Sequence, residues 1–521
     1  MRYDAVIVGA GHNGLAAAAL LAQKGWSVGV FERNPVAGGA VQTREMTLPG
    51  FRHDLGAMNL SLFAGSPFHQ ENAAELAGHG LEFAPVNKCF SSAFPDGKWL
   101  GVTTDLEETA AKIRSFSQQD ETTWRSLVGG FGASAPHIFS LLGSPMTPWS
   151  LAKTGWKSWR SMGKDWVYDT GRLLLSSPRT WLDEQFESSH VRSTLAAWGM
   201  HLDFPPDMAG GALFPYLEAM ANQSFGMVIG KGGADTMIKA LCTMIKANGG
   251  EVHTDAEVSE IIVSAGSATG IRLADGRTAD ANKAVIANIA PSLLVNKLLR
   301  QGSGNPSFDK GMKAFRHAPG TMMIHLAMDD LPDWAAGDAL KEFAYVHLAP
   351  SYSVMADAYT QAKAGMLPAE PVLVVGQPTA IDPGRAPEGK HILWIQVRVV
   401  PGEVSGDASG EIEGTNWDDI KEIYADRAMA ILERYAPGTG AKVLARTVQA
   451  PTDLERENPN LIGGDQICGS HHLSQNFLFR PISGWSNWKT PITNLHMVGA
   501  ATWPGAGVGA GSGTMLAKQL L

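Results

Sequence analysis

Three observations predict that this chain folds as an α/β protein with two domains. Its 521 residues are more than a single hydrophobic core usually supports. The patterns of a strand, a glycine-rich turn, a helix and a second strand follow one another within the first 32 residues. Similar patterns return in the middle and at the end of the chain. We therefore expect one α/β domain built from separate chain segments and a discontinuous α+β domain between them.

Composition and charge narrow the class of protein. Hydrophobic residues make up 44% and charged residues 18% of the chain, which is typical of a soluble globular protein. The formal net charge of −9 at pH 7 argues against nucleic acid as a partner, because no basic stripe is present to displace counterions. Cys89, Cys242 and Cys468 match neither a CxxC motif nor a zinc spacing, so we expect no metal site.

We expect no N-terminal targeting signal. Met1 to Asp4 lead directly into Ala5 to Val8, which already has the pattern of a buried strand. The most apolar stretch, residues 5–22, is interrupted by three glycines, a histidine and an asparagine, so we expect no membrane-spanning helix. With cysteines scattered in this way, the sequence predicts a reducing, cytoplasmic location.

A dinucleotide-binding motif follows the first strand. The sequence Gly9-Ala10-Gly11-His12-Asn13-Gly14 comes directly after residues 5–8, and residues 15–22, all Leu or Ala, predict a helix. A second strand over residues 27–31 ends at Glu32. GxGxxG in this setting, with an acidic residue about 20 positions further on, is typical of a Rossmann-type domain.

Each residue of the motif has a physical role in that interpretation. Gly9 permits a tight turn, Gly11 lets the backbone approach a pyrophosphate, and Gly14 allows the helix to pack closely on the strand. The helix N-terminus offers free N–H groups and a positive dipole end to the phosphates. The carboxylate of Glu32 can accept hydrogen bonds from an adenosine ribose.

A second glycine pair indicates which dinucleotide is bound. Gly38 and Gly39 lie in segment 33–40, just after Glu32, as in flavoproteins of the glutathione reductase-like and amine oxidase-like folds. There the loop passes close to the FAD pyrophosphate. No second strand–GxGxxG–helix unit with a downstream acid occurs, and the glycine-rich stretch 505–513 lacks that acid. We therefore predict FAD and no separate NAD domain.

The remaining patterns predict how the two domains divide the chain. The FAD-binding domain comprises residues 1–85, 226–300 and 446–521, and the substrate-binding domain comprises residues 86–225 and 301–445. In the second FAD segment we expect a helix over residues 234–247. Residues 258–263 and 269–273 alternate like a hairpin that closes near residues 274–276. The final segment predicts a strand over residues 495–498 and a helix over residues 512–521.

Tryptophan and basic residues alternate in segment 145–185. The residues concerned are Trp149, Trp156, Trp159, Trp166 and Trp181, interleaved with Lys153, Lys157, Arg160, Lys164, Arg172 and Arg179. Interfacial helices on membranes have this composition, and an apolar substrate entrance would also suit it. The alternative is an amphipathic helix packed on its own domain or on a second subunit of a homodimer, with its charges in water.

The two ends of the chain resemble a known family. Residues 4–15 and residues 498–508 are similar to the opening and closing motifs of the phytoene desaturase-related FAD-dependent oxidoreductases. His12-Asn13-Gly14-Leu15 is typical of the branch named pyridine nucleotide-disulphide oxidoreductase domain-containing protein 2. Residues 463–465, 479–481 and 484–486 also resemble that branch. The resemblance implies an amine oxidase-like two-domain fold with noncovalent FAD.

The resemblance also implies which residues contact the cofactor. The residues expected to contact the adenosine and pyrophosphate are Gly9, Gly11, Gly14, Glu32, Arg33, Gly39 and Ala40. The adenine is expected to contact the backbone of Val258. Those expected near the flavin ring and ribityl chain are Gly56, Ala57, Met58, Gly499, Ala500, Gly507 and Val508. Many relatives have arginine where Ala40 stands, which leaves open whether Arg44 takes over a phosphate contact.

Candidates for catalytic side chains lie beside the closing glycine-rich loop. His471 and His472 could face the substrate cavity as acid–base groups, and Trp503 could stack near the ring. The structural alternatives are an exposed or core histidine and a packed indole. Arg480 could pair with a substrate anion, although a structural role is the preferred interpretation.

The leading hypothesis is a dehydrogenase or desaturase that takes hydride from a largely apolar substrate, polyprenoid or aryl. Its electrons would pass to oxygen or a quinone. Three alternatives remain open at this point: a flavin amine oxidase, a redox-neutral FAD-dependent isomerase, and a membrane-associated interaction protein with a structural flavin.

Overall fold

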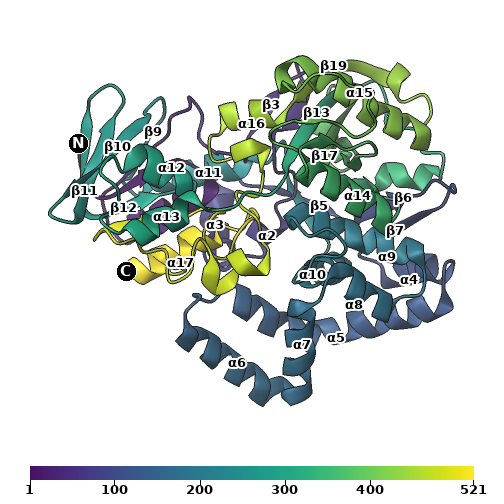
Figure 1. Ribbon diagram of the computed structural model, residues 1–521, viewed down its shortest axis with the longest axis horizontal. Coiled ribbons are helices and arrows are strands. Elements are labelled where there is room, and N and C mark those ends of the chain that lie inside the picture. Colours follow the sequence, from purple (N-terminus) through teal and green to yellow (C-terminus); the bar gives the residue numbers. More distant parts are fainter.

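The computed structural model describes all 521 residues. Its main elements are two sheets of seven strands each and a helical segment beside the second sheet (Figure 1). Both chain termini lie at the first sheet. Its strand order is β10-β11-β12-β1-β2-β9, with β20 on β12. The bounds are β1 Arg2–Val8, β2 Val28–Phe31, β9 Glu251–His253, β10 Val258–Ser264, β11 Ser267–Leu273, β12 Thr278–Ala287 and β20 Leu495–Met497.

The first sheet is parallel at its centre, where the nucleotide-binding motif lies. β1 runs parallel to β2 and β12, and β9 and β20 extend this parallel part on either side. Helices cover one face and bury their apolar sides against it. They are α1 His12–Gln23, α3 Pro67–Gly78, α11 Asp235–Ala247 and α17 Gly511–Leu520. On the opposite face, apolar side chains of β1, β2 and β12 pack with those of β10, β11, the helical turn Leu294–Leu298 and α13 Pro306–Lys313. The short helix α12 Pro291–Leu293 leads into that turn.

One strand connection differs from the sequence prediction. β10 and β11 do form an antiparallel hairpin, but Ala265 and Gly266 close it. The predicted closing turn at residues 274–276 instead joins β11 to β12. Both turns contain a glycine with positive φ, so turn chemistry alone does not assign them to a particular pair of strands.

The second sheet is largely antiparallel and belongs to the other domain. Its order is β19-β13-β17-β16-β14-β6-β7, and only β14 and β6 run parallel. The bounds are β6 Lys88–Ala93, β7 Trp99–Thr103, β13 Gly320–Met328, β14 Tyr345–Leu348, β16 Val372–Gly376, β17 His391–Val400 and β19 Val443–Gln449. The predicted domain boundary at 445/446 therefore falls inside β19.

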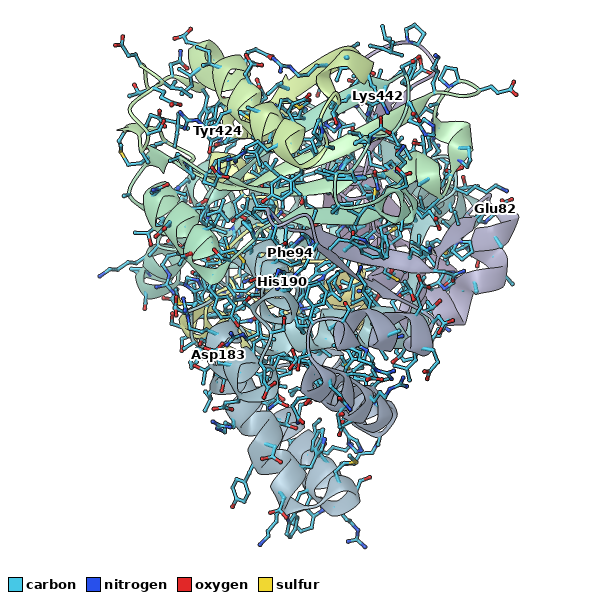
Figure 2. All side chains as sticks on the ribbon, turned by 90° about the vertical axis from the view of Figure 1, so that its right-hand side faces the viewer. Glu82, Phe94, Asp183, His190, Tyr424 and Lys442 are labelled. Atoms are coloured by element: carbon cyan, nitrogen blue, oxygen red, sulfur yellow. The ribbon has the colours of Figure 1, made fainter.

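Helix α15, Trp417–Tyr435, covers the outer face of the second sheet with apolar side chains. Figure 2 shows Tyr424 of this helix on the outer side, and shows Phe94 and His190 next to each other below the sheet. The ring centroids of Phe94 and His190 are 4.5 Å apart, so α9, Ser189–Ala196, contacts the sheet there. Two short strands, β15 Met366–Leu367 and β18 Gly406–Asp407, pair beside α14, Tyr352–Lys363.

A helical segment occupies most of residues 106–225. The helices are α4 Leu106–Arg114, α5 Gln118–Leu142, α6 Pro148–Met162, α7 Lys164–Leu175, α8 Pro178–Gln185, α9 and α10 Leu213–Phe225. The helices α6 and α7 extend away from both sheets (Figure 1). None of the helices combines the length and hydrophobicity needed to cross a bilayer.

Short elements connect the two domains. β5 Phe83–Val86 pairs with β8 Met227–Gly230, and β3 Thr43–Glu45 pairs with β4 Arg52–Asp54. The buried guanidinium of Arg385 bonds the carboxylates of Asp54, in β4, and Asp382, in the second domain. Helix α2 Ser61–Ala64 precedes α3, and α16 Pro451–Glu457 packs on β13 and β19.

Candidate functional site

Two helix N-termini meet at the carboxyl end of β1. Gly11 caps α1 and Ala510 caps α17, and neither end receives a hydrogen bond from a capping side chain. Neither helix carries an acidic residue in its first turn. The helices touch at Gly513, whose N–H lies 3.4 Å from the side-chain oxygen of Asn13. Two uncapped positive dipole ends so close together form a natural site for an anionic ligand.

The glycines of the motif form a cradle that has no room for side chains. A Cβ atom on Gly14 would lie 2.7 Å from the carbonyl oxygen of Gly9. A Cβ atom on Gly11 would lie 2.9 Å from the side-chain nitrogen of Asn288. Gly9 adopts a φ of +90°, which other residues rarely adopt. The backbone is therefore bare where the sequence predicts that it approaches a pyrophosphate.

Asn288 is a member of this site that the sequence reasoning missed. It directly follows β12, and its side-chain nitrogen lies 3.4 Å from the carbonyl oxygen of Gly9 and 3.3 Å from that of Gly11. A Cβ on Gly499 would lie 2.8 Å from the Asn288 side-chain oxygen. Asn288 thus links the opening motif to the closing loop. What places it there is the parallel pairing of β12 with β1, a contact between distant segments that no local sequence pattern shows.

Glu32 is buried at the end of β2. One carboxylate oxygen accepts a hydrogen bond from the N–H of Ala10 at 2.9 Å, and the other accepts one from Asn34 at 2.9 Å. The carboxylate therefore stabilises the glycine-rich turn through its hydrogen bond with Ala10. Glu32 is not a surface carboxylate, because only 7% of the residue is exposed.

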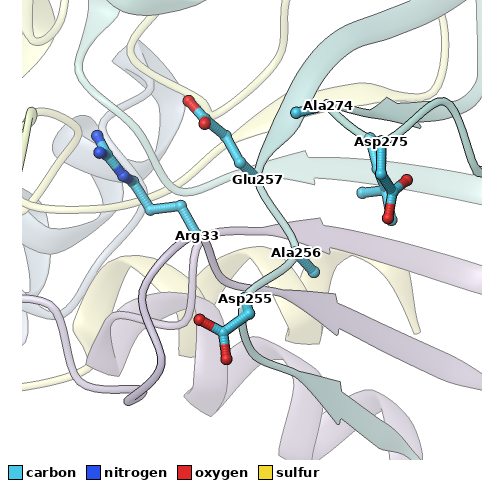
Figure 3. A pocket seen from close by; sticks show the side chains of 7 residues that line it. Arg33, Asp255, Ala256, Glu257, Ala274 and Asp275 are labelled. Carbon is cyan, nitrogen blue, oxygen red and sulfur yellow. The ribbon is translucent and has the colours of Figure 1, made fainter.

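A cavity of about 240 Å³ lies beside Arg33, the residue that follows Glu32 in the chain (Figure 3). Arg33 and Glu257 line it, and their side chains lie on the same side of it. Val258, the residue expected at the adenine, is buried at the start of β10 beside this cavity. The cavity thus lies where the sequence places the adenosine half of the cofactor, and those contacts stay a prediction.

The second glycine pair lies against the motif. Gly38 bridges to Gly11, and a Cβ on Gly39 would lie 3.5 Å from the Cα of Gly11. Ala40 packs on Gly56, since a Cβ there would lie 2.8 Å from the carbonyl oxygen of Ala40. Arg44 forms an ion pair with Glu457, so in this structure its charge is directed at a carboxylate.

The segments expected at the flavin ring come from both ends of the chain. Leu62, just after the Gly56–Ala57–Met58 segment, lies beside Gly507 and Gly509 of the closing loop, and 54% of it is exposed. Val508 is half-buried in the same loop. Met58 is buried, and its sulfur would lie 3.3 Å from a Cβ on Gly376 of the second sheet. The predicted ring site therefore lies between the two domains.

His471 and His472 lie in different environments. The Nε2 atom of His471 accepts a hydrogen bond from the N–H of Ala506 at 2.9 Å, and burial holds its pKa well below the usual range. A neutral imidazole in that position supports the closing loop. His472 lies 3.2 Å from a carboxylate oxygen of Asp203, and Tyr359 donates to that carboxylate at 2.9 Å. The catalytic roles expected for both histidines stay predictions.

Trp503 and Arg480 are both buried within the protein. The indole N–H of Trp503 donates to the carbonyl of Ser144 at 2.8 Å, and its ring packs against Phe477 in the core of the first domain. This geometry favours the packing alternative. Arg480 donates to the carbonyl oxygens of Ala500 and Ser470, at 2.6 and 2.9 Å, which agrees with the structural role preferred for it.

The comparisons with known proteins place this geometry in a family. Residues 14–502 match the model of the flavin-containing amine oxidoreductases. Pyridine nucleotide-disulfide oxidoreductase domain-containing protein 2 of Rattus norvegicus is 28% identical, with 98% of this chain and 92% of the relative covered. A neurosporene-forming phytoene desaturase of Cereibacter sphaeroides is 24% identical, with 99% and 94% covered.

A solved structure shows the same fold. An oxidoreductase from Methanosarcina mazei superimposes with a TM-score of 0.65 at 19% identity, and all of both chains is covered. The family resemblance and the fold class expected from the sequence are thereby confirmed. The uncapped helix ends and the glycine cradle fit the pyrophosphate of FAD, the family's cofactor. The chain belongs to the flavin-containing amine oxidoreductase family and is an FAD-dependent oxidoreductase.

Proposed function

We propose that this oxidoreductase is a dehydrogenase or desaturase that takes hydride from a largely apolar substrate of polyprenoid or aryl type. One observation carries the proposal: the predicted ring site adjoins a buried apolar and aromatic core cluster. It includes Met58, at the predicted ring site, together with Trp198, Tyr345 and Trp394. The resemblance to a phytoene desaturase supports a substrate of this class.

The protein's part in such a reaction is to hold a substrate C–H bond in place and to exclude water. When bound, FAD supplies the hydride acceptor. Met58 and the aromatic cluster can orient an apolar chain by contact area, and they keep solvent from the reacting carbon. The proposed acceptor for the electrons is oxygen or a quinone.

Anaerobic bleaching of the bound flavin tests this proposal. Polyprenoid and aryl compounds are mixed with the purified holoenzyme, and loss of the flavin absorption band is followed. Bleaching by these compounds and not by primary amines is the expected result. Bleaching by amines alone would establish an amine oxidase instead, and turnover of an isomer only after prior reduction would establish an isomerase.

We further propose that the helical hairpin formed by α6 and α7, residues 148–175, contacts an anionic membrane surface. Trp149, Trp156 and Trp159 are exposed by 79%, 59% and 47%. Lys153 and Arg160 share the helix face of Trp149 and Trp156 at spacings of three and four residues. Exposed indoles between basic side chains suit the headgroup region of anionic lipids.

Vesicle sedimentation tests the membrane contact. The holoenzyme should bind vesicles that contain phosphatidylglycerol more strongly than neutral phosphatidylcholine vesicles. A variant with serine at Trp149, Trp156 and Trp159 should lose most of that binding. Ile423→Ser, at a residue of α15 that is 52% exposed, serves as the control. If the triple variant instead dissociates a dimer and leaves vesicle binding unchanged, the hairpin is a subunit interface.

A further inference from the structure

The two faces of the second sheet differ sharply in chemistry. The face under α15 is apolar, with Ile395 and Val397 of β17 in its core. The opposite face carries Trp394, Gln396 and Arg398 of the same strand, since alternate residues point to opposite sides. Tyr345 and His347 of β14 lie on this face too, because register pairs their strand with β17 through β16.

Arg398 is a buried cation that has no carboxylate partner. Only 6% of it is exposed. One Nη atom donates to the carbonyl oxygen of His201 at 2.7 Å and to that of Met200 at 3.2 Å, and the other donates to the side-chain oxygen of Gln396 at 3.2 Å. Its Nε–H has no hydrogen-bond partner. A buried guanidinium in this state is costly unless an anion completes its environment.

The backbone beside Arg398 is distorted in a way that aims the side chain. Val399 has a φ of +61°, which is unfavourable for a β-branched residue. It is the additional residue of a β-bulge, because Arg398 pairs with Thr321 while Val400 pairs with Gly320. Bulges and strained backbone often occur where a side chain is directed at a ligand.

Arg398 lines a small internal cavity that has room for one oxygen atom. Its volume is about 10 Å³, and its polar lining includes Asp203, Thr321, Asp465 and Gln466. The side-chain N–H₂ of Gln466 also lacks a hydrogen-bond acceptor. Two unpartnered donors, one of them cationic, therefore meet at a single cavity.

The two carboxylates of the cavity are already engaged. Asp465 accepts hydrogen bonds from the N–H groups of Ala318, Ile467 and Gly469 at 3.0, 3.0 and 2.6 Å. Asp203 interacts with Tyr359 and His472. Neither carboxylate lies within ion-pair distance of Arg398. The unmet requirement of the cavity is consequently an acceptor for the guanidinium.

Two chains of contacts connect the lining of the cavity with residues of the predicted ring site. Residues 465–467 form one wall of the cavity, and the same loop continues to His471, which contacts Gly505 of the closing loop. On the other side, Trp394 lies two residues along the strand from Gln396, and its neighbour Gly376 contacts Met58. The ring of Trp394 is 5.9 Å from that of Tyr345.

We propose that Arg398 and Gln466 bind one oxygen atom of a substrate carboxylate, and that the aromatic cluster contacts the apolar part of the substrate. The inference rests on the proposed function and narrows it, because the substrate becomes an apolar carboxylic acid. Burial lowers the pKa of Arg398 to about 10, and a bound carboxylate would oppose that shift.

Ligand binding to the holoenzyme tests the inference with two readouts that do not require turnover. Benzoate and decanoate are titrated against benzamide and decanol, and both the flavin absorption spectrum and the Tm are recorded. We expect each carboxylate to bind at least tenfold more tightly than its neutral analogue. A charge-assisted hydrogen bond from a buried guanidinium typically contributes a factor of about 10 to 100.

Variants separate charge from packing. Arg398→Met should abolish the preference for carboxylates, Arg398→Lys should keep part of it, and Gln466→Leu should reduce it. Arg427→Met is the matched control. Arg427 is a largely buried arginine of α15, and it forms an ion pair with Asp407. If Arg398→Met does not fold, the lysine and leucine variants decide the question.

Two results would overturn the inference. One is equal binding of carboxylates and neutral analogues by the parent protein. The other is carboxylate affinity that is unchanged in Gln466→Leu and Arg398→Lys. Failure of the proposed function would look different: apolar compounds would not bleach the flavin, although carboxylates would still bind and raise the Tm.

Discussion

Replacing Gly513 by alanine should separate the two helix N-termini on which cofactor binding depends. A Cβ at this position would lie 1.9 Å from the carbonyl oxygen of Asn13 and 3.2 Å from the N atom of Ala17. Real Cβ atoms essentially never approach other atoms closer than 3.0 Å, so α17 must move by about 1 Å. Both nearby atoms belong to the backbone of α1, and a rotamer change cannot relieve the clash.

The expected cost follows from this displacement. Overpacking of a rigid core costs about 1–3 kcal/mol, and a clash between two helix backbones belongs at the upper end. A loss of about 3 kcal/mol lowers the Tm of a domain of this size by about 6 °C or more. Because the N–H groups of both first turns move apart, we also expect FAD to bind at least tenfold more weakly.

Flavin content and thermal unfolding measure the two effects. The ratio of flavin to protein absorbance is compared after dialysis, and the Tm is measured with and without added FAD. Gly171→Ala on α7 is the control, since nothing lies within 4 Å of its Cβ and alanine favours the helix. If Gly513→Ala had the same flavin content and the same Tm as Gly171→Ala, the contact between α1 and α17 would not organise the site.

Three further changes address single side chains. Glu32→Ala should weaken FAD retention, measured by dialysis, because the ribose and the N–H of Ala10 both lose an acceptor. Arg385→Met should cost about 3–5 kcal/mol in chemical unfolding, because Asp54 becomes a buried, unpaired carboxylate. Burial raises the pKa of Glu218 from 4.5 to about 7, so the folded protein keeps a proton that the unfolded chain releases, and stability falls as pH rises through that range. Glu218→Gln should therefore raise the Tm above pH 7 and leave it nearly unchanged at pH 4.5.

Each of these expectations has a result that contradicts it. Full flavin retention in Glu32→Ala would limit Glu32 to bracing the turn. Arg456→Met, which breaks an exposed ion pair with Asp418, should cost under about 1 kcal/mol, and an equal loss in Arg385→Met would remove the argument from burial. A Tm difference for Glu218→Gln that does not change with pH would exclude proton binding at Glu218 as its cause.

The local patterns of the sequence were sufficient to predict the glycine-rich motif of the nucleotide-binding half, the helix after it and the two strands that flank them. The motif at residues 9–14 fixes a strand before it and a helix after it, because only a bare backbone allows that turn. The buried strand that ends at Ala287 was also recognisable from its apolar run. Its position beside β1 was not, since strand order depends on pairing between distant segments. Asn288 escaped notice for that reason.

The second sheet shows the opposite limit. β17 is apolar enough to predict a strand, but Trp394, Gln396 and Arg398 lie within it without any local motif. The face of the sheet that these side chains occupy becomes buried only when the first domain covers it. The bulge at Val399 is equally invisible in the sequence, because valine strongly favours extended backbone and is not expected at positive φ. Tertiary packing alone determines these features.

The contribution of residues 495–520 to the cofactor site has a consequence for synthesis. β20 pairs with β12, and α17 packs on α1, so segments that are synthesised long after the opening motif complete the cofactor site. A nascent chain cannot hold the flavin between the two helix ends during translation. Contacts between such distant segments also form slowly, which exposes the unpaired edge of β12 in the meantime. We therefore expect cellular FAD supply and chaperones to act after residues 495–520 have left the ribosome.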